Sequence, residues 1–158
     1  MSKGDSALMM PAQATTVLRK ILVIDDNPII QRAVYFALRD KGFLVLMSGT
    51  ISDALNLIHQ QKPELILLDL NFPVDSSDLG VSLSDGFTAL QWLRRTDHAK
   101  NLPIVVISGS NEGESRPRAL ALGASAYLAK PLDKEKLQTL IVTLLGKHPP
   151  NPTAYPLS

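Results

Sequence analysis

Five short runs of apolar residues, each continuous rather than alternating with polar residues, constrain the fold of this chain more than any other feature. A strand that is apolar on both faces must be covered on both sides, which is typical of parallel sheets. Segments with helical periodicity separate the runs, and this alternation within one domain predicts a right-handed, doubly wound α/β fold. The runs are residues 21–24, 44–46, 65–68, 104–107 and 126–129.

Helix signals occupy the intervals between these runs and the segment after the last one. Asn27 is followed by a proline, so a helix is expected to begin there, and Thr50 begins another in the manner of a capping box. Apolar stripes place a third helix around residues 87–93 and a fifth around residues 137–145. Because proline is costly inside a helix, the fourth is predicted to be short and to begin near Pro117.

The length of 158 residues suits one compact domain with short extensions. We expect residues 1–18 to form a flexible leader and residues 19–147 to form the domain. The proline-rich residues 148–158 are expected to be a tail without a regular element.

Composition and charge exclude several classes of protein. The net charge is +1 and no run of lysine or arginine occurs, so we expect no direct contact with nucleic acid. No apolar stretch approaches the roughly 20 residues that a membrane-spanning helix needs, and the N-terminal residues lack the apolar core of a signal peptide. The chain has no cysteine, which fits a reducing compartment, so a cytoplasmic location is expected.

Polar residues whose side chains can take part in binding or catalysis follow four of the five apolar runs. Asp25 and Asp26 follow the first run, Asp69 the third, Ser108 the fourth and Lys130 the fifth. Ligands of doubly wound folds bind at the carboxyl ends of the strands, and in a parallel sheet these ends share one edge. Charged residues are rarely buried unless they are paired, so packing does not explain this placement. We therefore expect three carboxylates, a hydroxyl and an ammonium group to converge.

Such a cluster favours a divalent cation and phosphoryl chemistry. Three neighbouring carboxylates repel one another and raise the pKa of at least one of them. Mg2+ relieves this repulsion, since it prefers oxygen ligands and often bridges carboxylates and phosphate. A carboxylate can also act as a nucleophile and form an aspartyl phosphate. Phosphoryl transfer depends mainly on positioning and charge neutralisation, which Mg2+, Lys130 and Ser108 would provide.

The four sites, in this order over residues 19–147, resemble the receiver domains of two-component response regulators of the chemotaxis type. The resemblance implies a flavodoxin-like sheet of five parallel strands in the order 2-1-3-4-5, flanked by five helices. It implies that Asp69 is phosphorylated by a histidine kinase or a phosphotransfer protein. It further implies that Mg2+ is ligated by Asp26, Asp69 and the backbone carbonyl of Asn71, with Asp25 acting mainly through water.

The resemblance also implies a switch and a kind of output. Lys130 would pair with Asp69 and then with the phosphoryl oxygens, and the Lys130-Pro131 bond would be cis. Ser108 would move toward the phosphoryl group, and Tyr127 would reorient with it. Output would be contact with an unknown downstream protein. Enzymatic activity would be limited to Mg2+-dependent self-phosphorylation and autodephosphorylation.

Two alternatives and one departure from the family remain. The chain can be a receiver module taken from a larger hybrid kinase or multidomain regulator. It can also be a phosphatase that forms an aspartyl phosphate, although haloacid-dehalogenase-type enzymes have a second acid where this chain has Asn71. The departure is the serine- and aspartate-rich segment of residues 72–85, longer than the usual loop before the third helix. It is interpreted as a surface loop, a lid or a contact for a particular kinase.

Overall fold

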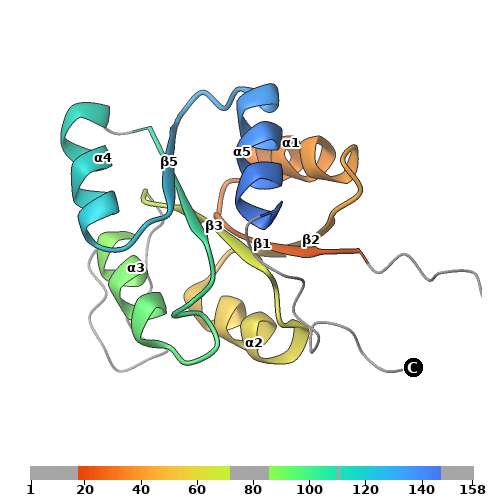
Figure 1. The fold of residues 1–158 in the computed structure, drawn as a ribbon, viewed down its shortest axis with the longest axis horizontal. Coiled ribbons are helices and arrows are strands. Elements are labelled where there is room, and N and C mark those ends of the chain that lie inside the picture. The colour runs from red at the N-terminus through yellow and green to blue at the C-terminus, as the bar shows by residue number, and fades with distance from the viewer. Residues whose placement is uncertain (1–17, 72–85, 110, 147–158) are drawn as a thin grey trace, which may run out of the picture.

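The structure is a computed structural model, and it describes residues 18–71, 86–109 and 111–146 (Figure 1). Strands and helices alternate along the described chain. In order they are β1 (Lys20–Ile24), α1 (Pro28–Arg39), β2 (Leu44–Ser48), α2 (Ile51–Gln61), β3 (Leu65–Asp69), α3 (Gly86–Arg95), β4 (Ile104–Ser108), α4 (Glu112–Ala121), β5 (Ala126–Ala129) and α5 (Lys134–Gly146). Most of the predicted leader, the predicted tail and the segment of residues 72–85 lie outside the described residues.

The strands form one parallel sheet in the order β2-β1-β3-β4-β5. Helices α1 and α5 cover one face, and α2, α3 and α4 cover the other (Figure 1). The prediction of a doubly wound, flavodoxin-like fold with strand order 2-1-3-4-5 is therefore confirmed. Among the residues that the structure describes, no helix is long and apolar enough to cross a membrane.

The continuous apolar runs are explained by two hydrophobic cores, one on each face of the sheet. Successive residues of a strand point to opposite faces. In β1, Ile21 and Val23 pack in the core that includes α1 and α5, whereas Leu22 and Ile24 pack in the core of α2, α3 and α4. All five residues of β1, β3 and β4 are buried, so these three central strands have no solvent-facing side.

The predicted helix caps are present. The side chain of Asn27 accepts a hydrogen bond from the backbone N–H of Ile29 at 2.9 Å, and that of Thr50 accepts one from Asp53 at 3.1 Å. Helix α3 begins at Gly86, where a Cβ atom would lie 2.5 Å from the Cα atom of Leu70. A glycine is required there because the helix start presses against the backbone that leaves β3.

The predicted start of the fourth helix near Pro117 is wrong. Helix α4 begins at Glu112 and contains the proline. Asn111 caps its first turn, accepting a hydrogen bond from the N–H of Gly113 through its side chain at 3.1 Å and one from Ser115 through its carbonyl at 2.9 Å. Pro117 removes one helical hydrogen bond, while the cap and the ion pair of Arg116 with Glu112 stabilise the turns before it.

Candidate functional site

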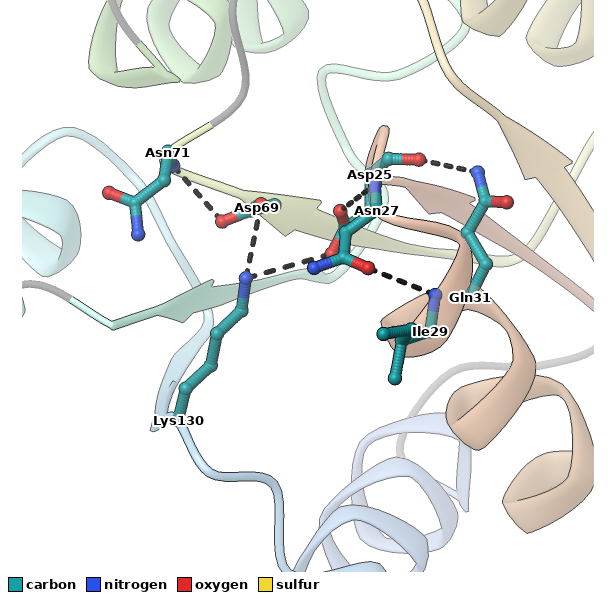
Figure 2. Close-up of polar contacts among 7 residues, drawn as sticks. All are labelled: Asp25, Asn27, Ile29, Gln31, Asp69, Asn71 and Lys130. Carbon is teal, nitrogen blue, oxygen red and sulfur yellow. Dashed lines mark hydrogen bonds and ion pairs between the residues drawn. The ribbon is translucent and has the colours of Figure 1, made fainter.

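The carboxyl edge of the sheet brings together the polar residues that follow its strands. Asp25 directly follows β1, and its N–H donates to the carbonyl of Ser48 at the end of β2 at 3.1 Å. Asp69 and Ser108 are the last residues of β3 and β4. The N–H of Lys130, just after β5, donates to the carbonyl of Ser108 at 2.9 Å. The predicted convergence is therefore present, and Figure 2 shows its central part.

Asp69 lies at the centre of the cluster and is held by both of its carboxylate oxygens. Oδ2 lies 3.1 Å from the ammonium Nζ of Lys130, and Oδ1 accepts a hydrogen bond from the backbone N–H of Asn71 at 3.0 Å (Figure 2). Only 3% of Asp69 is exposed. Its carboxylate is thus nearly buried and lies close to the ammonium group of Lys130, as the sequence predicted. The backbone N–H of Asn71 fixes its orientation.

Asp25 is buried beside other charged groups of the cluster. Its Oδ1 accepts from the N–H of Asn27 at 2.8 Å, and its Oδ2 lies 3.8 Å from Lys130 Nζ. The pKa of Asp25 is raised from 3.8 to about 6, mainly by burial and also by the charges of Asp69 and Asp26, while the N–H of Asn27 and the charge of Lys130 oppose the rise. Within the described residues, the buried Oδ2 of Asp25 receives no hydrogen bond.

These observations fit a divalent cation at the three aspartates. Asp25, Asp26 and Asp69 each offer one carboxylate oxygen, and these oxygens lie within 4.8 Å of one another. One ammonium group, that of Lys130, faces three carboxylates, so negative charge remains in excess. A hard cation with oxygen ligands would supply the missing positive charge and a partner for Asp25 Oδ2. Coordination by the backbone carbonyl of Asn71 stays a prediction.

The two predicted switch residues are both buried. Ser108 is fully buried at the end of β4, beside the cluster. Tyr127 is 4% exposed and belongs to the core of α2, α3 and α4, with the guanidinium of Arg116 centred 5.2 Å from its ring. The hydroxyl of Tyr127 is buried, and no described residue forms a hydrogen bond with it. Their movement on phosphorylation stays a prediction, whereas the cis Lys130-Pro131 bond is present.

The structure adds residues that the sequence interpretation did not include. Asn27 was predicted as a helix cap, and its N–H also holds the carboxylate of Asp25. Gln31, at the end of the first turn of α1, donates from Nε2 to the backbone carbonyl of Asp25 (Figure 2). Its position four residues after Asn27 is the only signal in the sequence, and a glutamine in a helix has many other uses.

Comparisons with known proteins match the folded region that carries this site. A family model of the response regulator receiver domain matches residues 21–142. The phosphate regulon transcriptional regulatory protein PhoB of Escherichia coli is 30% identical over 132 residues, which cover 84% of this chain and 54% of PhoB. The chain thus spans about half the length of this curated relative.

Solved structures share the fold. A putative response regulator from Chloroflexus aurantiacus J-10-fl matches with a TM-score of 0.71 and 24% identity, over 82% of this chain and 99% of that one. The receiver domain of the sensor histidine kinase PA1611 from Pseudomonas aeruginosa PAO1 matches with a TM-score of 0.68 and 25% identity, over 82% and 99% of the two chains. That structure has a magnesium ion coordinated in its active-site cleft.

Proposed function

Because the chain belongs to the response regulator receiver domain family, we propose that it is a Mg2+-dependent switch that accepts a phosphoryl group on Asp69 from a histidine kinase or a phosphotransfer protein. Receiver domains serve phosphorylation-based signalling and are not classical enzymes. One observation carries the assignment to Asp69. This aspartate is nearly buried, lies 3.1 Å from the only ammonium group described in the cluster, and shares the site with two further carboxylates.

The proposed reaction is a displacement at phosphorus. A carboxylate oxygen of Asp69 forms a bond to phosphorus, the bond from phosphorus to the donor breaks, and the donor leaves with the electron pair of that bond. Lys130 is placed to neutralise charge on the phosphoryl oxygens, since its Nζ already pairs with Asp69. A Mg2+ ion held by Asp26, Asp69 and the carbonyl of Asn71, with Asp25 acting mainly through water, would supply further positive charge.

The proposed response then passes from the phosphoryl group into the fold. The hydroxyl of Ser108 would donate a hydrogen bond to a phosphoryl oxygen, and Lys130 would pair with the same group. Tyr127 would change its packing as Ser108 moves, and this change would reach the surface through β5 and α4. The cation contact of Arg116 with the Tyr127 ring offers one route, since Arg116 belongs to α4.

We further propose that output is a contact with a downstream protein, without direct contact of this chain with nucleic acid or a membrane, and that the location is cytoplasmic. The balanced net charge and the lack of a basic run support the proposal that the chain does not contact nucleic acid. The absence of cysteine fits the proposed cytoplasmic location. PhoB is named as a transcriptional regulatory protein and is about twice as long as the matched region. A receiver within a larger regulator or hybrid kinase is therefore compatible with the same site.

The test is mass spectrometry of the intact chain after incubation with Mg2+ and acetyl phosphate. We expect one hydroxylamine-sensitive phosphoryl adduct, absent from Asp69→Asn and absent when EDTA replaces Mg2+. Asp97→Asn is the matched control, because Asp97 is an exposed aspartate paired only with Lys100 in the described structure. An adduct that persists in Asp69→Asn, or none in the unmodified chain, would contradict the proposal.

A further inference from the structure

We propose that Gln31 is a positioning residue for the divalent cation: its side-chain amide holds the peptide group between Asp25 and Asp26 and thereby orients two of the three carboxylates that meet there. The inference rests on the proposed function, because it concerns the same site. It assigns a role to a residue of α1 that is neither charged nor a member of the carboxylate cluster (Figure 2).

The bond joins a helix side chain to the main chain of the acidic turn. Gln31 Nε2 donates to the carbonyl oxygen of Asp25 at 2.5 Å. That carbonyl belongs to the peptide unit that links Asp25 to Asp26. Because a peptide unit is planar and trans, the direction of its carbonyl sets the direction of the following N–H and Cα atom. Gln31 therefore controls the plane from which the Asp26 side chain leaves the turn.

Besides its ion pair with Lys130, Asp25 takes part in three hydrogen bonds in the described structure, and Gln31 provides one of them. Its N–H donates to Ser48 of β2 at 3.1 Å, and its Oδ1 accepts from the N–H of Asn27 at 2.8 Å. Both of these bonds involve backbone groups of the neighbouring segment. Only the bond from Gln31 depends on a side chain that can be replaced without altering the helix cap at Asn27.

A hydrogen bond that orients the carboxylates matters for cation binding, because the three carboxylates repel one another. The three carboxylates approach one another within 4.8 Å, and Asp26 is exposed whereas Asp25 and Asp69 are buried. Without the bond from Gln31, repulsion favours rotation of the peptide unit and movement of Asp26 away from the other two. Mg2+ demands nearly ideal octahedral geometry, so a displaced ligand lowers its affinity.

If Gln31 served only to stabilise the fold, its loss should affect cation binding no more than the loss of a comparable glutamine elsewhere. Gln138 is that comparable glutamine. Gln138 lies on α5, is 8% exposed, and its Nε2 donates to the carbonyl of Ala37 at 2.7 Å. Gln138→Met therefore removes the same kind of hydrogen bond at the packing of α5 against α1. If Gln31 matters only for stability, Gln31→Met and Gln138→Met should affect the cation site in the same way.

The experiment measures Mn2+ binding to the full chain by electron paramagnetic resonance, with urea unfolding of each variant to confirm that it is folded. We expect Gln31→Met to weaken Mn2+ binding about tenfold, as replacement of residues that orient metal ligands commonly does. Gln138→Met should stay within about twofold of the unmodified chain, since its hydrogen bond is to Ala37, which lies further along α1 than Gln31. The Mg2+ concentration for half-maximal phosphorylation by acetyl phosphate should rise in Gln31→Met, with recovery of the rate at saturating Mg2+.

Gln31→Glu separates positioning from simple charge. The glutamate adds negative charge near the cation, which by itself would tighten binding, but its carboxylate cannot donate to the Asp25 carbonyl. Weaker Mn2+ binding in Gln31→Glu supports positioning, and tighter binding overturns it.

Two further outcomes overturn the inference alone: Mn2+ binding by Gln31→Met that equals that of the unmodified chain, or an equal loss in Gln138→Met. No Mn2+ binding by the unmodified chain would instead overturn the cation site and the proposed function with it.

Discussion

Replacing Asp25 by asparagine is expected to stabilise the metal-free protein at neutral pH, although Asp25 belongs to the proposed site. In the folded chain its carboxylate is buried, faces two other carboxylates, and has one oxygen to which no described residue donates a hydrogen bond. An asparagine keeps an acceptor for the N–H of Asn27 and removes the buried negative charge. The substitution therefore removes the free-energy cost of keeping the negative charge of Asp25 buried in the folded state.

The magnitude follows from the pKa of Asp25. Folding raises it from 3.8 to about 6, and each unit corresponds to about 1.4 kcal/mol, so the ionised group destabilises the folded state by about 3 kcal/mol. Because the folded-state pKa is raised, this destabilisation is complete above about pH 6 and is lost as the pH falls toward 3.8. The advantage of Asp25→Asn should therefore be largest at neutral pH and disappear at about pH 4.

Urea unfolding in EDTA across this pH range is the assay, with the free energy of unfolding as the readout. Asp97→Asn is the control, since an exposed ion pair contributes at most about 1 kcal/mol. Addition of Mg2+ at about 100 times its dissociation constant should then stabilise the unmodified chain by about 2.7 kcal/mol and Asp25→Asn by less. A metal-free Asp25→Asn that is no more stable at neutral pH, or whose advantage grows on acidification, would refute the reasoning.

Three other substitutions or conditions test separate parts of the structure. Mn2+ affinity of the unmodified chain should fall as the pH drops below about 6, because protonation of Asp25 removes a negative charge from the cation site; a titration with equal affinity at about pH 7 and about pH 5 would contradict this. Gly86→Ala should lower the free energy of unfolding by about 1–3 kcal/mol, since its Cβ would lie 2.5 Å from the backbone of Leu70, whereas Gly146→Ala, with nothing within 4 Å, should not destabilise. Asn111→Ala should cost about 1 kcal/mol by removing the cap of α4, with faster hydrogen exchange confined to that helix; unchanged exchange would show that the cap does not hold it.

The strands and the composition of the site could be predicted because each depends on short-range patterns. A strand buried on both faces requires a continuous apolar run, and the five runs at residues 21–24, 44–46, 65–68, 104–107 and 126–129 match the strands within two residues. The polar residues at the carboxyl ends of β1, β3, β4 and β5 then had to meet, because parallel strands end at the same edge. Asp69 and Lys130 are 61 positions apart in the chain and are joined by that topology alone.

Helix α4 shows where local patterns compete. Pro117 argued for a late start, whereas Asn111 with Glu114 three residues later is itself a capping signal. In the structure the helix begins at the cap and continues through the proline, and its first turns also carry the ion pair of Arg116 with Glu112.

The covered strands and the residues at their carboxyl ends could be read from the amino-acid order, because hydrophobic periodicity and chain direction are local properties. The distances between those residues, and their effects on one another, come from the folded arrangement. Burial of Asp25 against Asp69 raises its pKa, and Gln31 is brought onto the Asp25 carbonyl by the packing of α1. Both effects depend on distances between groups and on the exclusion of water, which no pattern along the chain records.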